Sequence, residues 1–310
     1  MNKIHPTLLK NLTAVSLFSG AGGGSLALLY NYLNELLAID NWSAAQKAFE
    51  ANFKDEKHIP FWNADIYSIS GNDILRRILM GVGELTLLLL SPPCQGLSVA
   101  KGKINPLDPR NGLFLHSISL IEQIRPKIFI IENVPGMSDP RNTSIFNEIK
   151  LRIREQLGPH YNIKLFNLNA SFYQTGQERN RYIFIGYAKS FGIIPTAPTP
   201  DSLARERLRI VDIDPSITAI KVGQSKKIIK HNTKRMNTIT ASEPVTIYSD
   251  GKEMKMSIEQ DKKFASFPDW YQMPIDISKD DAHKLMGNTI PPMLMKNIVE
   301  HILSEVGNLL

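Results

Sequence analysis

The stretch TAVSLFSGAGGGS at residues 13–25 decides the fold. An apolar run of strand character leads directly into glycines at positions 20, 22, 23 and 24. Glycines at a strand-to-helix turn let the backbone approach a ligand closely, and the N-terminus of the next helix adds oriented N–H donors. Ser25 occupies the third glycine position of the strict dinucleotide pattern, so the loop indicates a nucleoside cofactor without saying which one. The alternative is a glycine-rich turn that binds no ligand.

Strand-like and helical stretches alternate from Thr13 to Ala188. Most strand-like runs are continuously apolar, as is typical of strands buried on both faces. We therefore expect an α/β fold, with a Rossmann-like, mostly parallel sheet flanked by helices. The expected strands are Thr13–Phe18, Glu35–Asp40, His58–Asn63, Leu85–Ser91, Lys127–Glu132, Ile163–Leu168 and Arg181–Tyr187. The expected helices are Gly23–Leu33, Ser43–Asn52, Asp73–Leu79, Leu113–Gln123 and Thr143–Gln156.

A second, smaller and irregular domain is expected from residue 191 onward. Prolines recur at positions 195, 198 and 200, and Lys221 to Met236 contains six Lys or Arg and no Asp or Glu. The tail from Ala282 to Leu310 returns to helical periodicity and is expected to pack back on the first domain. We predict a catalytic domain of residues 1–190 plus 280–310 and a small recognition domain of residues 191–279.

Composition limits the classes of function. The chain has 310 residues and a formal net charge of +6, which favours a polyanionic partner. Cys94 is the only cysteine, which excludes a disulfide framework or a cysteine-based metal site within the chain. Met1 to Asn11 lacks an apolar signal-peptide core, and the apolar run Leu85–Leu90 is too short to span a membrane. We expect a soluble cytoplasmic protein without a metal.

Two acids and one thiol lie at or just after the ends of expected strands. Asp40 stands twenty residues after Gly20, where a carboxylate can bind ribose hydroxyls, and Asp65 could accept a hydrogen bond from an adenine amino group. Cys94 follows the strand Leu85–Ser91 through two prolines, at the edge of the sheet where ligands bind. A stiff loop outside the apolar run favours a reactive thiol over a structural one.

A carboxylate and two guanidinium groups accompany this thiol. Glu132 ends the neighbouring strand, so its acid would lie near Cys94 and suit attack on a ring with proton delivery to it. Arg179 and Arg181 point to one face of an extended segment and need anions to share, either a phosphate or the carboxylates already named. A capping or ion-paired glutamate and a solvated basic edge are the structural alternatives.

Together these residues resemble the cytosine-C5 DNA methyltransferase family. Five motifs occur in the family's order: FSGAGG at 18–23, PPCQ at 92–95, ENV at 132–134, Gln177-x-Arg179-x-Arg181, and GNTIPP at 287–292. DPRNGLF at 108–114 and FPD at 267–269 also match. The resemblance covers Thr13 to Gly186 and about Arg235 to the C-terminus.

The resemblance implies an S-adenosylmethionine pocket, with S-adenosylhomocysteine as the product. Gly24 and Trp42 depart from the aromatic positions usual in the family, which leaves open how the adenine would stack. The residues implied to line the pocket are Phe18, Gly20, Gly22, Gly23, Asp40, Asn41, Asp65, Ile66, Pro93, Asn288 and Ile290.

The resemblance also implies the chemistry. Cys94 would attack C6 of a cytosine flipped out of duplex DNA, and Glu132 would protonate N3, so that C5 takes the methyl group. Arg179 would hold Glu132 and the base, and Arg181 would assist near the cysteine. The residues expected to contact DNA are Gln95, Ser98, Lys101, Lys103 and Arg110 in a mobile loop, and Lys226, Lys227, Lys230, Lys234 and Arg235 in the recognition region.

Length is the largest departure, because Tyr187 to Lys234 leaves only 48 residues to read a target. We expect a monomeric prokaryotic or phage enzyme that methylates double-stranded DNA at a specific sequence, with a restriction endonuclease of the same system as a candidate partner. A tRNA cytosine methyltransferase on the same fold and a catalytically inactive regulator are the alternatives. The family's tRNA branch carries a Cys-Phe-Thr segment that is absent here.

Overall fold

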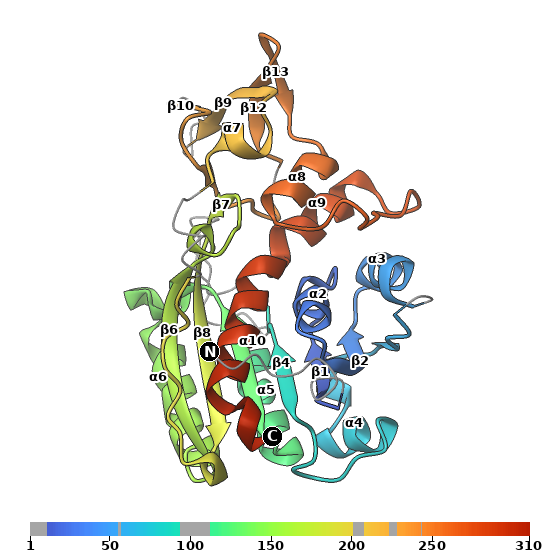
Figure 1. Cartoon of the computed structure of the whole chain (residues 1–310), viewed down its shortest axis with the longest axis vertical. Helices are drawn as coiled ribbons and strands as arrows, with labels where there is room; N and C mark the ends of the chain where they lie inside the picture. Colours follow the sequence, from blue (N-terminus) through green and yellow to red (C-terminus); the bar gives the residue numbers. More distant parts are fainter. Residues whose placement is uncertain (1–10, 55–56, 94–111, 201–207, 223–227, 243) are drawn as a thin grey trace.

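A seven-stranded, mostly parallel sheet forms the centre of the chain (Figure 1). The computed structural model describes residues 11–54, 57–93, 112–200, 208–222, 228–242 and 244–310. The strand order is β3-β2-β1-β4-β5-β8-β6, and β8 runs antiparallel to both of its neighbours. The expected strands are confirmed, with ends that differ by a few residues. The strands are β1 (Thr13–Leu17), β2 (Asn34–Asp40), β3 (Phe61–Asn63), β4 (Leu87–Leu90), β5 (Ile128–Asn133), β6 (Tyr161–Asn169) and β8 (Asn180–Ala188).

The central strands are buried on both faces. Leu88 and Leu90 of β4 belong to one apolar cluster, and the alternating Leu87 and Leu89 belong to a second cluster on the opposite face. Full burial of such a side chain contributes about 1.5–3 kcal/mol. Continuously apolar strands therefore bind helices on both sides, which explains why the sequence showed no alternation.

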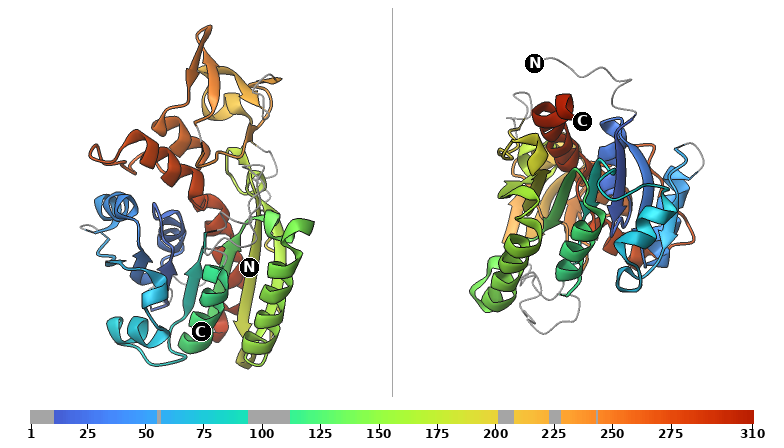
Figure 2. Two further views of the ribbon diagram at one scale, coloured as in Figure 1. Left: turned by 180° about the vertical axis from the view of Figure 1, so that it is seen from behind. Right: turned by 90° about the horizontal axis from the view of Figure 1, so that it is seen from below.

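Helices cover both faces of the sheet. The packing clusters place α2, α3 and α10 against one face and α4, α5 and α6 against the other. Figure 2 (right) shows the red helix α10 and the green helices α5 and α6 on opposite sides. In the described part of the chain, no helix is long and apolar enough to cross a membrane. The bounds are α2 (Gly23–Tyr30), α3 (Ser43–Phe53), α4 (Gly71–Arg77), α5 (Gly112–Ile124), α6 (Thr143–Arg152), α8 (Ile258–Phe264), α9 (Lys279–Asn288) and α10 (Pro292–Val306).

The segment that we expected to be irregular contains a four-stranded antiparallel sheet of order β10-β9-β12-β13, accompanied by the short helix α7 (Ile210–Ile213). Its strands are too short, and β13 too exposed, to give a long alternating pattern. The Asp250-Gly251 turn was a signal for the hairpin that we did not use, since both residues adopt the positive φ that such turns require. The strands are β9 (Ile217–Val222), β10 (Ile228–His231), β12 (Thr246–Ser249) and β13 (Lys252–Lys255).

A short ladder and one buried guanidinium join the two sheets. Strand β7 (Gln177–Glu178) pairs in parallel with β11 (Met236–Asn237). The next residue, Arg179, is 2% exposed. Its Nη1 donates to the carbonyl of Ile239 at 2.8 Å, and its Nη2 donates to those of Gly287 and Thr289, both at 2.9 Å. One side chain thus ties the strand leading into the large sheet to the segment between β11 and β12 and to the α9–α10 junction.

We predict that Arg179→Ala lowers the free energy of unfolding by about 3 kcal/mol or more, because each buried carbonyl left without a donor costs about 1–3 kcal/mol. Urea denaturation measures this loss. Arg209→Ala is the control, since Arg209 forms an exposed ion pair with Asp212 at 2.7 Å and such pairs contribute about 0–1 kcal/mol. Equal losses in the two variants would show that the carbonyl contacts do not stabilise the fold.

Candidate active site

The site lies at the carboxyl ends of β1 and β4. Strand β1 lies between β2 and β4 and is parallel to both. The strands β2 and β3 follow on one side of β1, and β4 and β5 follow on its other side, so the strand order reverses at β1. Open α/β sheets bind ligands at such a switch point. The loops after the two strands touch there: the Ser91 amide donates to the Leu17 carbonyl at 3.3 Å, and the Ser91 hydroxyl donates to the Phe18 carbonyl at 3.0 Å.

The glycine loop is open on one side and closed on the other. Phe18, Gly20 and Gly22 have φ of 58°, 53° and 78°. A Cβ at Gly20 would have no atom within 4 Å, whereas one at Gly23 would lie 2.2 Å from the Ile290 carbonyl oxygen. Glycine at 23 therefore lets α2 approach the segment after α9, while the open side at Gly20 leaves backbone accessible to a ligand.

Asp40 at the end of β2 is held by this loop. Its Oδ2 accepts from the Gly20 amide at 2.9 Å and its Oδ1 accepts from the Trp42 amide at 3.0 Å. Burial raises the pKa of Asp40, and the amide donors oppose that shift. Asp40, the residue expected to bind the ribose hydroxyls, thus lies directly beside the glycine loop.

The remaining expected pocket residues lie around this loop in different environments. Asp65 is exposed and accepts from the Tyr67 amide at 3.0 Å, so it caps a short 3-10 helix. Ile66 is 4% exposed and belongs to an apolar cluster. Asn41 and Asn288 are exposed, Pro93 is partly exposed, and Ile290 is buried.

Glu35, a buried acid under the glycine loop, was missed by the sequence reasoning. Its Oε1 accepts from the Ser16 hydroxyl and, at 3.0 Å, from the Ser25 hydroxyl. Its Oε2 is buried and has no hydrogen-bond partner among the described residues. Desolvation raises the pKa of Glu35 to about 7, against the lowering effect of both serines. Ser25 at the expected third glycine position was the available signal, because its hydroxyl needs a buried partner.

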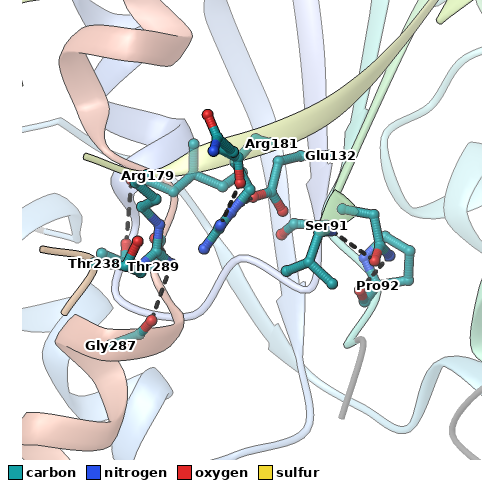
Figure 3. A network of polar contacts seen from close by, with 12 residues as sticks. Ser91, Pro92, Glu132, Arg179, Arg181, Thr238, Gly287 and Thr289 are labelled. Atoms are coloured by element: carbon teal, nitrogen blue, oxygen red, sulfur yellow. Dashed lines mark hydrogen bonds and ion pairs between the residues drawn. The ribbon is translucent and has the colours of Figure 1, made fainter. Parts of the chain in front are cut away.

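Glu132 and Arg181 form a buried ion pair at the same edge of the sheet (Figure 3). Arg181 Nε lies 2.6 Å from Glu132 Oε1, and their side chains are 9% and 10% exposed. Pairing an acid with a guanidinium offsets much of the cost of burying each charge.

Glu132 obtains this partner from the antiparallel pairing of β5 and β8. Glu132 faces Ile183, and Arg181 lies two residues away on the same face. Arg181 is thus a direct partner of Glu132, a role that we had expected of Arg179. Arg179 stands in the break between β7 and β8, and its guanidinium donates to three backbone carbonyls.

Asn133 connects Glu132 to the loop that leads to Cys94. Its Nδ2 donates to the Pro92 carbonyl at 3.2 Å, and its Oδ1 accepts from the Val134 amide at 2.8 Å. The acid and the start of the cysteine loop therefore share one anchor. Eight of the expected site residues lie outside the described residues: Cys94, Gln95, Ser98, Lys101, Lys103, Arg110, Lys226 and Lys227.

The described residues expected to contact DNA differ in their surroundings. Lys234 is exposed. Arg235 Nη1 lies 3.1 Å from Glu178 Oε1, and Lys230 Nζ lies 3.7 Å from Glu178 Oε2. Two of the expected phosphate contacts are therefore paired with an acid of this chain.

Comparisons with known proteins agree on one family. The family described as C-5 cytosine-specific DNA methylase matches residues 12–260 and 216–304. The chain is 27% identical to the Type II methyltransferase M1.HphI of Haemophilus parahaemolyticus, over 96% of this chain and 88% of that protein. It is 26% identical to M.HpaII of Haemophilus parainfluenzae, over 98% and 93% respectively. The S. pombe Dnmt2 methyltransferase structure shares the fold, with a TM-score of 0.69 and 18% identity over 96% of this chain and 100% of that one.

We predict that Glu35→Gln changes how stability depends on pH. The pKa of Glu35 is about 7 in the folded protein against an ordinary value of 4.5, so between these values the folded state binds the proton more tightly than the unfolded chain does. The stability of the wild type therefore falls as pH rises through this window, and a glutamine has no proton to lose. Relative to the wild type, the variant should gain on the order of 3 kcal/mol between pH 4 and pH 8, at about 1.4 kcal/mol per pKa unit.

Urea denaturation across this pH range tests the effect. Glu155→Gln is the control, because Glu155 is exposed and lies 3.8 Å from Arg154. Parallel pH profiles for the wild type and Glu35→Gln would contradict the prediction.

Proposed function

The chain belongs to the C-5 cytosine-specific DNA methylase family and is a DNA cytosine-5-methyltransferase, and from this premise we propose that it acts through a covalent bond between Cys94 and C6 of a flipped-out cytosine. The observation that carries the proposal is the Glu132–Arg181 pair. It places a buried acid at the carboxyl end of the strand beside β4, and Asn133 anchors that acid to the loop leading to the thiol.

The residues around the glycine loop fit S-adenosylmethionine, the cofactor of this family. The open side of Gly20 can accept a ligand against the backbone, and Asp40 offers a carboxylate beside it. When bound, this cofactor supplies the methyl group that C5 of the base accepts. We propose the same pocket lining as the resemblance implied, with Ile66 contributing from the apolar side.

The chemistry assigns one role to each group. The Cys94 thiolate forms a bond to C6, and Glu132 gives a proton to N3, so the electron pair moves to C5 instead of building charge on the ring. C5 then takes the methyl group. Water then takes the C5 proton, so that the C5–C6 double bond re-forms and the thiolate leaves, and Glu132 takes back the proton from N3. Arg181 orients Glu132 throughout, because their ion pair fixes the carboxyl at the end of β5.

Flipping is required because C5 and C6 cannot be reached inside a stacked duplex. We propose that residues 191–279, with the four-stranded sheet, form the recognition domain that holds the DNA. Lys234 is an exposed candidate for phosphate contact. Because the similar proteins named above are Type II methyltransferases, we also propose that this enzyme modifies one short sequence, as the partner of a restriction endonuclease.

Transfer of labelled methyl groups from S-adenosylmethionine to unmethylated duplex DNA is the first test. We expect label at C5 of cytosine in one short sequence motif, and none with Cys94→Ala. A duplex with 5-fluorocytosine at the target should trap the wild-type protein covalently, because fluorine at C5 cannot leave as the proton does. Label without trapping would contradict the covalent bond, and label in tRNA but not in DNA would favour the tRNA alternative.

We further predict that Glu132→Gln lowers the rate of methyl transfer about 10²–10⁴-fold, the range typical of lost acid catalysis. The amide keeps the shape of the side chain but has no acidic proton for N3. Single-turnover kinetics with saturating DNA separates this loss from weaker binding. Glu148→Gln, which removes an acid from an exposed pair with Arg152 at 2.7 Å, should leave the rate unchanged. A rate for Glu132→Gln within tenfold of wild type would exclude Glu132 as the acid.

A further inference from the structure

Glu178 lies between two cations that belong to the basic run of the recognition region. Its Oε1 is 3.1 Å from Arg235 Nη1, and its Oε2 is 3.7 Å from Lys230 Nζ. The two contacts use different oxygens, so the carboxylate bridges the cations. The family motif leaves the position of Glu178 open, and the chemistry proposed above gives this acid no role.

These ion pairs are weak by their geometry and exposure. The side chains of Glu178, Lys230 and Arg235 are 37%, 20% and 34% exposed, so water screens the attraction. Arg235 contacts the carboxylate through one nitrogen rather than through both prongs of its fork. Its Nε is buried and has no hydrogen-bond partner among the described residues. The guanidinium therefore keeps donor capacity that Glu178 does not use.

A stronger anion can replace such a carboxylate. Phosphate groups form charge-assisted hydrogen bonds with Arg and Lys, and DNA presents phosphates as a regular array. Lys230 Nζ is oriented by the Asn237 side chain, to which it donates at 2.7 Å. Asn237 and Glu178 are paired in the β7–β11 ladder, so the backbone holds this site in place even without the ion pairs.

The position of the bridge relates it to the candidate active site. Glu178 precedes Arg179, and Arg181 follows Arg179 by two residues and pairs with Glu132. In Figure 1, β7 lies between the large sheet and the four-stranded sheet. A DNA backbone phosphate bound by Lys230 and Arg235 would therefore lie between the proposed recognition domain and Glu132.

We propose that Lys230 and Arg235 form a binding site for a phosphodiester of the DNA backbone, and that Glu178 is the resident anion which this phosphate displaces. The inference rests on the proposed function only in taking duplex DNA as the substrate. In the free protein, Glu178 neutralises the two cations and holds them beside β7. On binding DNA, the phosphate takes both cations and the carboxylate turns to solvent.

Glu178→Gln tests the displacement. Removing the competing charge should tighten binding of a fluorescent duplex by about two- to fivefold near 0.1 M salt. The slope of log K against log salt should stay about the same, because the wild type and the variant neutralise the same phosphate. Fluorescence anisotropy with a duplex of arbitrary sequence suffices, since phosphate contacts are independent of sequence. Glu300→Gln is the matched control, because Glu300 pairs with Lys296 at 2.7 Å on α10 and the change in net charge is the same.

Binding by Glu178→Gln that is unchanged or weaker than that of Glu300→Gln would overturn the proposal. If Glu178→Gln does not fold, Arg235→Gln decides, with weaker binding and a slope shallower by about one expected, and unchanged binding overturning the site. The methyl-transfer assay keeps the two proposals apart. Wild-type protein that methylates DNA, with no change of binding in either variant, would refute only the phosphate site, whereas absence of transfer to DNA would refute the proposed function itself.

Discussion

The three carbonyl contacts of Arg179 are the constraint on which the arrangement of the two sheets depends. They join the strand that enters the large sheet, the segment between β11 and β12 that leads into the small one, and the junction before α10. A buried guanidinium is costly unless its donors are used, so these segments stabilise the fold only when they lie together. These contacts therefore hold the proposed recognition domain in place relative to Glu132, the proposed acid.

The antiparallel strand β8 is what completes the candidate site. In the parallel strands, the candidate site residues lie at the carboxyl ends, where the glycine loop, Pro92 and Glu132 are close together. A basic residue could not reach this edge from the amino end of a further parallel strand. Because β8 runs the other way, its first residues start at this edge, and Arg181 reaches Glu132 directly.

Function brings costs that the surrounding packing must offset. Phe18 adopts a left-handed φ of 58°, and Glu35 is buried with one oxygen unpartnered among the described residues. Both lie beneath or within the glycine loop, where a ligand needs open backbone. Strained or incompletely bonded groups commonly occur at binding sites, because the rest of the structure holds them in place.

The sequence by itself determined the α/β fold, the order of its strands along the chain, the switch-point loops and the family, because these follow from local apolar runs and short motifs. It did not predict the small antiparallel sheet, whose four short strands lack a sustained pattern, although Asp250-Gly251 marked one hairpin. Only the tertiary structure decided that Arg181 pairs with Glu132, that Glu35 is buried under Ser25, and that Glu178 neutralises Lys230 and Arg235. The reason is physical: a motif fixes which charges a chain carries, but the partner of each charge depends on strand register and on contacts between segments far apart in sequence.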